Sequence, residues 1–407
     1  MEKKKICVIG LGYIGLPTAA IIVNKGYSVS GIDVNDKIVS TINKGEIHIV
    51  ENDLEASVKS AVLSGRLKAY NKVQPSDIYI ICVPTPFHKN NDSIPKPNID
   101  FVLSATKSIA PLIKSGDLII LESTCPVGTT EKIKQTMLEC GAKLENTHIA
   151  YCPERVLPGK IMNELVENDR IIGGLTSIST KQAADFYRSF VNGNIIETDA
   201  KTAEMCKLAE NSFRDINIAF ANELSMICYE QSINVWNLIN LANKHPRVNI
   251  LKPGTGVGGH CIAVDPWFIV SQDNENTKLI QTAREVNNQK TRWVIKKIKN
   301  NANEFISEIG SKPKIVCLGI TYKPDIDDLR ESKALEVVET LIAEKHEVIV
   351  VEPNIYKHKK LLIQNFFEAI EQADLVCVLV KHREFLQPEI RNKLLKCKLL
   401  DFCGALS

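Results

Sequence analysis

Two glycine-rich segments of this 407-residue chain have the residue types and spacing for chemistry on a bound nucleotide. The first, Gly10-Leu11-Gly12-Tyr13-Ile14-Gly15, follows an apolar run and opens a helical pattern. In such a turn the first glycine permits the bend, the second lets a pyrophosphate approach the backbone, and the third lets helix and strand pack closely. The helix N-terminus adds partial positive charge. Residues 10–15 therefore predict a dinucleotide site.

An acid at the end of the next apolar run indicates which dinucleotide would bind. Asp33 closes the run YSVSGID, near the spacing of about 20 residues at which an acid contacts the ribose. A 2′-phosphate would meet like charge there, which favours NAD over NADP, although Lys37 weakens this preference. The alternative is a glycine-rich turn with an unrelated acid. We therefore expect NAD as the cofactor, with Asp33 and Lys37 beside it.

Two further loops follow apolar runs, Val83-Pro84-Thr85-Pro86 and Ser123-Thr124-Cys125-Pro126. Open α/β sheets place ligand contacts beyond the carboxyl ends of their strands. Thr85 and Thr124 are therefore candidate cofactor contacts, although ordinary turn chemistry explains each loop by itself more simply.

The second glycine-rich segment ends in a cysteine. Residues 254–259 contain four glycines, Gly258 among them, and His260 and Cys261 follow. Glycines let the backbone approach a ligand and present its amides to it. We expect Cys261 at the start of a helix, where the dipole favours the thiolate, and Asp265 could hold a water molecule or orient the site. Taken alone, Cys261 is one of twelve cysteines and is better explained as a core residue. However, the glycine-rich segment before it makes Cys261 the best candidate for a reactive cysteine.

A long helix is predicted from Asp199 to Ser232, because this stretch lacks Gly and Pro and its apolar residues recur at helical spacing. Lys207, Asn211 and Arg214 would share one face of it. A lysine and an amide on a buried face suit an oxyanion or a substrate hydroxyl. A solvated polar face explains this spacing better when it is taken alone.

A nicotinamide cofactor together with a nucleophilic cysteine makes a specific combination. Hydride transfer alone converts an alcohol to an aldehyde. A thiolate can trap that aldehyde as a thiohemiacetal, which loses a second hydride to give a thioester, and water then releases an acid. The residues therefore predict a four-electron oxidation of a primary alcohol to a carboxylate.

The elements that must position these residues alternate between apolar runs and helical patterns. KICVIG, YSVSGID, SDIYIICVPTP, DLIILEST and THIAYCP predict strands of one parallel sheet, and KPKIVCLGI, HEVIVVEP, ADLVCVLV and CKLLDFCG predict a second. A second helical stretch is expected from Asp273 to Asn303. We expect an α/β protein with two Rossmann-like, doubly wound parallel-sheet domains joined by a central long helix. The expected boundaries are 1–198 for the NAD-binding domain, 199–303 for the central helical region with the cysteine loop, and 304–407 for the second sheet domain. The alternative is one large continuous sheet.

The composition of the chain limits which kinds of partner and compartment are expected. Fifty Lys and Arg against 48 Asp and Glu give a net charge of +2, which argues against nucleic acid or an anionic membrane as main partner. No apolar run approaches the roughly 20 residues of a membrane-spanning helix, and the three glycines near the start do not fit a signal peptide. The cysteines form no C-x-x-C pair that would predict a metal site, and their scatter favours reduced thiols in the cytoplasm.

Along essentially its whole length the sequence resembles the UDP-sugar 6-dehydrogenase family. The resemblance is carried by GLGYIGLP, VPTP, STCPVGTT, CPERVLPGK, KLAEN, GVGGHCIAVDP and TYKPDIDDLRES. It implies NAD-dependent oxidation of a UDP-sugar at C6 to the acid, with two NAD reduced. Pro158 stands where UDP-glucose members carry a glutamate, and Gly258-Gly259-His260-Cys261 replaces their GGSC-like loop. Both departures favour a 2-acetamido sugar over glucose. The likeness of CPERVLPGK and HPRVNILKPGTGVGGHCIAVDPWF implies UDP-N-acetyl-D-mannosamine as the substrate, with UDP-GlcNAc, UDP-GalNAc and UDP-glucose left open.

The resemblance also implies roles for individual residues. Cys261 would be the nucleophile, and Lys207 would move a proton or stabilise an oxyanion. Asp265 would assist the water step, with Thr124 and Glu154 nearby. The remaining implied contacts are to the sugar, from Asn211, Arg214, Arg155, Val156, His245, Arg247, Gly258, Tyr322 and Lys323, and to NAD, from Arg330.

In relatives His245 and Arg247 commonly act across a dimer interface, so a homodimer or higher homo-oligomer built on the central helix is expected. One departure concerns the uridine contact, because relatives place an arginine after the last strand, where this chain reads Asp401-Phe402-Cys403-Gly404. A competing enzyme is a one-step 2-hydroxyacid or sugar-acid dehydrogenase, which also uses a Lys and an Asn four apart but needs no cysteine. A non-catalytic competitor is a nucleotide-sugar or NAD sensor.

Overall fold

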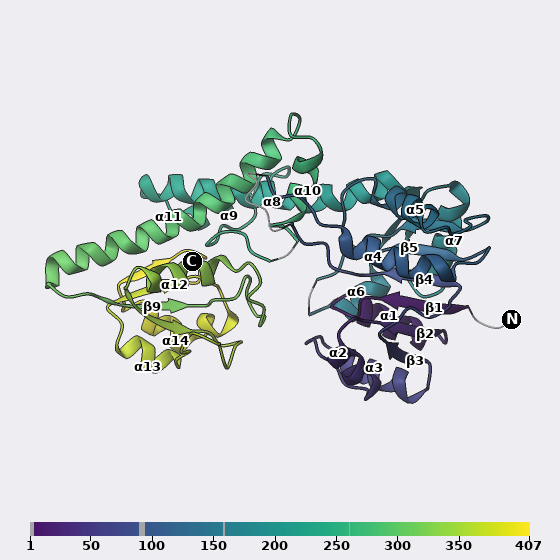
Figure 1. Cartoon of the computed structure of the whole chain (residues 1–407). Helices are drawn as coiled ribbons and strands as arrows, with labels where there is room; N and C mark the ends of the chain where they lie inside the picture. The colour runs from purple at the N-terminus through teal and green to yellow at the C-terminus, as the bar shows by residue number, and fades with distance from the viewer. Residues whose placement is uncertain (1–3, 89–93, 158, 260) are drawn as a thin grey trace. The chain divides into compact units, whose positions relative to one another are not determined.

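The computed structural model describes residues 4–88, 94–157, 159–259 and 261–407. Pro158 and His260, which the sequence comparison singled out, lie outside the described residues. The chain divides into two compact units, one of Met1–Glu210 with Trp267–Gln272 and one of Asn211–Pro266 with Asp273–Ser407 (Figure 1). Each unit is described by itself.

The first unit is built on an eight-stranded sheet of order β3-β2-β1-β4-β5-β6-β7-β8. Strands β4 and β5 are buried along their whole length, which explains their continuous apolar sequences IYII and LIIL. The strand bounds are β1 (Lys5–Ile9), β2 (Ser28–Ile32), β3 (Leu67–Tyr70), β4 (Ile78–Ile81), β5 (Leu118–Leu121), β6 (His148–Tyr151), β7 (Arg170–Gly174) and β8 (Ile195–Asp199).

Helices cover both faces of this sheet, because successive strand residues point to opposite sides. Ile6 and Val8 join the core under α1, α3, α6 and α7, whereas Cys7 and Ile9 join the core under α4 and α5. The helix bounds are α1 (Gly15–Asn24), α2 (Asp36–Asn43), α3 (Leu54–Leu63), α4 (Asp100–Ile109), the 3₁₀ turn η1 (Ala110–Leu112), α5 (Thr129–Glu139), α6 (Ile161–Glu167) and α7 (Ser177–Tyr187). This is the doubly wound arrangement that the sequence predicted.

The sequence analysis missed three strands, and one pair of strands is antiparallel where only parallel pairs were expected. The missed strands β3, β7 and β8 read LKAY, RIIGG and IIETD, and their lysine, glycines and acids interrupt the apolar pattern. Strand β7 pairs antiparallel with β6, so the sheet is not wholly parallel as expected. The segment between β6 and β7 contains the seven-residue helix α6, about 10 Å long. Strand β7 begins beside the carboxyl end of β6 and runs in the opposite direction.

Long helices follow the first sheet. Helix α8 runs unbroken from Ala200 to Glu230, which confirms the helix predicted for this stretch. The helices after it are α9 (Val235–Ala242), α10 (Asp265–Gln272) and α11 (Lys278–Ile309). No helix among the described residues is both long and apolar enough to cross a membrane.

The second unit contains a four-stranded parallel sheet of order β10-β9-β11-β12. One face packs on α11 and α12, and the other on α13 and α14. This second doubly wound sheet confirms the predicted fold class. The bounds are β9 (Lys314–Leu318), α12 (Lys333–Ala343), β10 (Glu347–Val351), α13 (Phe366–Glu371), β11 (Leu375–Val378), the 3₁₀ turn η2 (Arg383–Leu386), α14 (Pro388–Leu394) and β12 (Leu399–Asp401).

One lysine of α11 is buried in the second unit. Lys290 is 2% exposed, its Nζ donates a hydrogen bond to Ser225 Oγ at 2.8 Å, and it lies 4.0 Å from the centre of the Trp293 ring. A hydroxyl and an indole ring replace only part of the hydration that an ammonium loses on burial. Burial therefore lowers the pKa of Lys290 to about 7.

The stability of the protein should rise with pH because of Lys290. Between about pH 7 and 10.5 the folded chain binds fewer protons at this amine than the unfolded chain, so the free energy of unfolding increases with pH across that window. Lys290→Met should flatten this slope. The urea midpoint measured at pH 7, 8 and 9 checks it, with the exposed Lys296→Met as control. Equal slopes in wild type and Lys290→Met would contradict the assignment.

Candidate active site

The first glycine-rich turn connects β1 to α1. A Cβ added at Gly10 would lie 2.5 Å from the carbonyl oxygen of Cys82, and one at Gly15 would lie 1.8 Å from that of Gly10. A Cβ at Gly12 would meet no atom of the described residues within 4 Å, its two chain neighbours apart. The packing of the protein thus requires Gly10 and Gly15, whereas Gly12 borders open space before the N-terminus of α1. This space fits a pyrophosphate.

Asp33 comes directly after β2, as the sequence predicted. Its Oδ2 accepts a hydrogen bond from the Leu11 amide at 3.1 Å, and its Oδ1 accepts from the Asn35 amide at 2.9 Å. Asn35 in turn caps α2 by accepting from the Lys37 amide. Asp33 therefore helps to fix the glycine turn, and its contact with a ribose stays a prediction.

The two polar loops predicted at strand ends lie next to each other. They follow β4 and β5, which are neighbours in the sheet. Thr85 Oγ1 donates to the Thr124 carbonyl at 2.6 Å, and Ser123 Oγ donates to the Val83 carbonyl at 2.7 Å. The strand order reverses between β1 and β4, and open α/β sheets bind ligands at such a point.

Lys207 and Glu154 are brought together within the first unit. Lys207 Nζ donates to the backbone carbonyl of Glu154 at 2.6 Å. The Glu154 carboxylate is held by Arg170, with 2.7 Å between Oε2 and Nη1, and by the Arg155 amide at 2.6 Å. Both partners of the Glu154–Arg170 ion pair are buried. Burial opposes the charge of Arg170, but Glu154 and its neighbours keep the pKa of Arg170 above its ordinary value.

A second buried acid belongs to the same cluster. Glu122 accepts hydrogen bonds from Tyr187 Oη at 2.5 Å and Cys82 Sγ at 3.1 Å. Burial raises the pKa of Glu122, and Arg170 opposes that rise. The sequence analysis overlooked Glu122 and Arg170. The available signal was a charged residue at the end or start of an otherwise apolar strand.

Arg155 and Val156 were predicted to contact the sugar. The guanidinium of Arg155 makes a two-point ion pair with Glu210 of α8, at 2.7 and 3.1 Å. Val156 packs partly buried against the core of the first unit. Together with the Lys207 contact, this ion pair fixes the segment after β6 to α8, and the sugar contacts stay predictions.

Asn211 and Asp265 are brought together within the second unit. Asn211 Nδ2 donates to Asp265 Oδ2 at 2.5 Å, and both residues are buried. Further along α8, Asn222 Oδ1 accepts from the Gly254 amide at 2.9 Å. Two hydrogen bonds thus tie the cysteine loop to α8.

Cys261 does not stand at the start of a helix, so that expectation was wrong. It lies partly buried in a turn, where its carbonyl accepts from the amides of Val264 and Asp265, and α10 begins only at Asp265. Pro266 explains the difference, because proline lacks an amide hydrogen and is tolerated only in the first turn of a helix.

The cysteine loop packs against the segment TYKPDIDDLRES. A Cβ at Gly258 would lie 2.9 Å from Tyr322 Cβ, and one at Gly259 would lie 2.9 Å from the Tyr322 ring. The Gly259 amide donates to the Arg330 carbonyl at 3.1 Å. Gly258 and Tyr322, both predicted sugar contacts, are thus brought together. The guanidinium of Arg330, a predicted NAD contact, is paired with Asp328.

Three other predicted sugar contacts are exposed. Arg214 lies on α8, and His245 and Arg247 share the turn after α9, where the Arg247 amide donates to His245 Nδ1 at 3.3 Å. Lys323 is partly buried in the loop after β9. Among the described residues of the second unit, none of the contacts above involves Arg214, His245 or Arg247, and their roles stay predictions.

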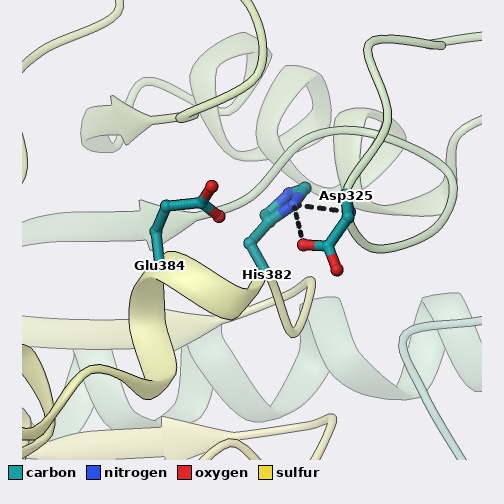
Figure 2. A group of neighbouring side chains, drawn as sticks. All are labelled: Asp325, His382 and Glu384. Carbon is teal, nitrogen blue, oxygen red and sulfur yellow. Dashed lines mark hydrogen bonds and ion pairs between the residues drawn. The ribbon is translucent and has the colours of Figure 1, made fainter. Parts of the chain in front are cut away.

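Metal-ligand side chains gather in one place within the described ranges. Asp325, His382 and Glu384 offer ligand atoms within 4.8 Å of one another (Figure 2). However, Nδ1 of His382 already accepts a hydrogen bond from the Asp325 amide at 3.0 Å. This group is therefore better described as a hydrogen-bonded network.

Comparison with known proteins places the chain in a family. Three models of the UDP-glucose/GDP-mannose dehydrogenase family match it in succession: the NAD binding domain over residues 4–191, the central domain over 201–289 and the UDP binding domain over 316–407. The chain belongs to the UDP-glucose/GDP-mannose dehydrogenase family. It is an NAD-dependent UDP-sugar dehydrogenase, which confirms the predicted family, enzyme class, cofactor and kind of substrate.

Relatives of this dehydrogenase match it over nearly its whole length. A UDP-N-acetyl-D-mannosamine dehydrogenase from Campylobacter jejuni is 51% identical, over 98% of this chain and 99% of that protein. An NDP-N-acetyl-D-galactosaminuronic acid dehydrogenase from Ralstonia nicotianae is 49% identical, over 95% of this chain and 92% of that protein. The solved structure of a UDP-D-ManNAc dehydrogenase from Pyrococcus horikoshii has a TM-score of 0.89 at 36% identity, covering 99% and 96% of the two chains.

Alanine at Gly12 should weaken NAD binding by this dehydrogenase without unfolding it. The added methyl enters open space, so the melting temperature should stay unchanged, whereas a bound pyrophosphate would collide with it. We expect the Kd for NAD to rise at least about tenfold. Calorimetric titration with NAD and thermal unfolding measure the two effects. Gly15→Ala is the matched control, because its methyl would overlap the Gly10 carbonyl and lower the melting temperature. Unchanged NAD affinity in Gly12→Ala would contradict the site.

Proposed function

We propose that this dehydrogenase oxidises UDP-N-acetyl-D-mannosamine at C6 to UDP-N-acetyl-D-mannosaminuronate. The observation that carries the two-step chemistry is the Asn211–Asp265 hydrogen bond, which fixes a buried carboxylate four residues from Cys261. The choice of sugar is supported by the likeness to mannosamine relatives over the whole chain. It is also supported by the loop Gly258-Gly259-His260-Cys261.

The residues of the first unit fit NAD. The open space at Gly12 would take the pyrophosphate, and we assign Asp33, Lys37, Thr85 and Thr124 to the rest of the cofactor, beyond the carboxyl ends of the strands. When bound, NAD accepts the hydride in each oxidation. We assign Arg330 to the cofactor as well.

In the first oxidation the C6 hydroxyl loses a proton and a hydride and becomes an aldehyde. We assign the proton to Lys207, whose amine position is fixed by its hydrogen bond to the Glu154 carbonyl. Arg170 supports this position indirectly, because it holds the carboxylate of the same Glu154. As an ammonium, Lys207 would also stabilise negative charge on the C6 oxygen.

In the second oxidation the thiolate of Cys261 adds to the aldehyde carbon to give a thiohemiacetal. Loss of its C6 hydride leaves a thioester, and attack by water breaks the carbon–sulfur bond to release the carboxylate and restore the thiol. Asp265 would orient that water, since Asn211 fixes one of its carboxylate oxygens. We assign Thr124 and Glu154 to the same step.

We propose that polar and small side chains from several segments hold the sugar. We also propose the division of the chain into an NAD-binding domain (1–198), a central helical region with the cysteine loop (199–303) and a sugar-nucleotide domain (304–407). We assign sugar contacts to Arg155, Val156, Asn211, Arg214, His245, Arg247, Gly258, Tyr322 and Lys323. The reduced thiol that the mechanism needs is maintained in the cytoplasm, which we propose as the compartment.

We further propose a homodimer formed through α8. Phe213, Phe220 and Ile227 are 68, 52 and 45% exposed and recur every seven residues, so they line one face of the helix. Large apolar side chains exposed in a row mark an interaction surface. A second copy of the same helix offers a complementary stripe.

The stoichiometry of NADH tests the proposed reaction. Wild-type enzyme should form two NADH for each UDP-N-acetyl-D-mannosamine consumed. Cys261→Ser should bind NAD normally but lose at least about a thousandfold in acid production, because the covalent intermediate cannot form. A panel with UDP-GlcNAc, UDP-GalNAc and UDP-glucose, with NADH counted spectrophotometrically, measures substrate choice.

Three outcomes would contradict parts of this proposal. One NADH per sugar would support the one-step dehydrogenase instead, and wild-type acid production by Cys261→Ser would remove the nucleophile. Faster turnover of another sugar in the panel would move the substrate assignment to that sugar.

A charge introduced among the exposed apolar residues of α8, Phe213, Phe220 and Ile227, tests the proposed dimer. Phe220→Glu should convert the dimer to monomers, because the interface would bury an unpaired carboxylate. Light scattering after size-exclusion chromatography gives the mass. Phe101→Glu is the control, since Phe101 is a phenylalanine of similar exposure, 49%, on a different helix, α4. A Phe220→Glu protein with the mass of the wild type would overturn the assignment.

A further inference from the structure

A carboxylate–imidazole pair joins three loops at the carboxyl edge of the second sheet. Glu352 follows β10, His382 follows β11, and residues 320–325 follow β9. Glu352 and His382 are fully buried, with 3.2 Å between Oε2 and Nε2. Glu352 Oε2 also accepts from the amides of Ile320 and Thr321, at 2.8 and 3.3 Å. The pair thus holds the first residues of the loop after β9.

The partners of His382 determine which ring nitrogen carries the hydrogen. The Thr321 hydroxyl donates to the Lys323 carbonyl at 3.0 Å, so it can only accept from His382 Nε2, 3.2 Å away. Glu352 is likewise an acceptor at Nε2. Although burial opposes its charge, hydrogen bonds from His382 and backbone amides bring the pKa of Glu352 below its ordinary value. Nε2 therefore carries the hydrogen.

Nδ1 of His382 therefore has a lone pair, and two neighbouring N–H groups can donate hydrogen bonds to it. The Asp325 amide lies 3.0 Å from Nδ1, and the side-chain amide nitrogen of Asn354 lies 2.9 Å from it. Asp325 has a φ of 61°, a left-handed conformation that is uncommon outside glycine and needs support from its surroundings. The hydrogen bond to His382 supplies that support.

These contacts weigh against a cation between Asp325, His382 and Glu384. In Figure 2 the dashed lines join the His382 ring to Asp325, and none reaches Glu384. A metal ion at either ring nitrogen would have to displace hydrogen bonds that are already made. The one feature that would suit a cation is Glu384 Oε2, which is buried and has no hydrogen-bond partner within the described part of the chain.

The loop after β9 reaches the cysteine loop through Tyr322. The Cβ and the ring of Tyr322 lie so close to Gly258 and Gly259 that a Cβ added at either glycine would come within 2.9 Å of the tyrosine side chain. The Gly259 amide is bound to the neighbouring Arg330 carbonyl. Movement of residues 320–325 would therefore move the backbone two and three residues before Cys261.

We propose that His382 is a positioning residue of the oxidation: Glu352 fixes its tautomer, and its Nδ1 anchors residues 320–325. This loop in turn holds Tyr322 against the glycines before Cys261 and presents Lys323 to the sugar. The inference rests on the proposed function for the roles of Cys261 and Lys323. Its structural part, the anchoring of the loop, does not depend on the substrate.

Paired substitutions of His382 separate the two ring nitrogens. Asn places an amide oxygen near Nδ1 and can still accept from Asp325, whereas Gln places its amide near Nε2 and cannot. His382→Asn should keep at least about a third of wild-type kcat/KM, and His382→Gln should lose about tenfold or more, mainly through a higher KM for UDP-N-acetyl-D-mannosamine. The Kd for NAD should not change in either. Equal activity of the two variants would overturn the proposal.

Glu352→Gln supplies a nearly isosteric second test. An N–H of its amide in the place of Oε2 would move the ring hydrogen to Nδ1, where it opposes the Asp325 N–H, and would also oppose the amides of Ile320 and Thr321. We expect a KM increase like that of His382→Gln, and faster amide hydrogen exchange at residues 322–325 and 258–259 in enzyme without substrate. Wild-type exchange in Glu352→Gln would overturn the proposal even if His382→Gln failed to fold.

Glu384→Gln is the matched control. The network predicts wild-type KM and exchange for it, whereas a cation site predicts a loss that added divalent metal reverses, and that result would overturn the proposal. Because hydrogen exchange is measured without substrate, a wrong sugar assignment would leave the exchange result intact. Failure of the proposed function and failure of this inference are therefore distinguishable.

Discussion

The hydrogen bond between Asn211 and Asp265 is the contact on which the catalytic arrangement of the second unit depends. It joins residues 54 positions apart, and both side chains are buried. A buried carboxylate without a partner costs on the order of 1–3 kcal/mol or more, so the bond constrains the cysteine segment and α8 to meet at this point. Asn222 and Gly254 repeat the same kind of contact three turns along the helix.

The same requirement applies at three buried ion pairs of this enzyme. Glu154 is paired with Arg170 beneath Lys207, Asp215 is paired with Arg284 at 2.6 Å between α8 and α11, and Glu352 is paired with His382 at the edge of the second sheet. Each pair lies beside a segment that carries a proposed site residue. Buried ion pairs contribute little net stability, but each strongly disfavours arrangements in which one partner is left alone. Their contribution here is to fix geometry.

The sequence predicts the strands and helices of the enzyme better than the contacts between their side chains. Continuous apolar runs such as IYII mark buried parallel strands whatever surrounds them, and α8 follows from a stretch without glycine or proline. Strand β7 was missed because RIIGG is short and ends in glycines, and its pairing with β6 and β8 makes it a strand. Arg170 and His382 could not be assigned, since the residues that give them roles lie 16 and at least 28 positions away, respectively. The start of α10 was misplaced although Pro266 marked it.

The unbroken course of α8 has a consequence for how this gene can vary. Lys207 and Asn211 stand one turn apart on a helix that advances about 1.5 Å and turns about 100° per residue. Substitutions between them leave that offset intact, but inserting or deleting a single codon would swing one side chain a quarter-turn away from the other. Length changes should therefore be excluded from this short interval, while the surface turns of both sheets can lengthen or shorten.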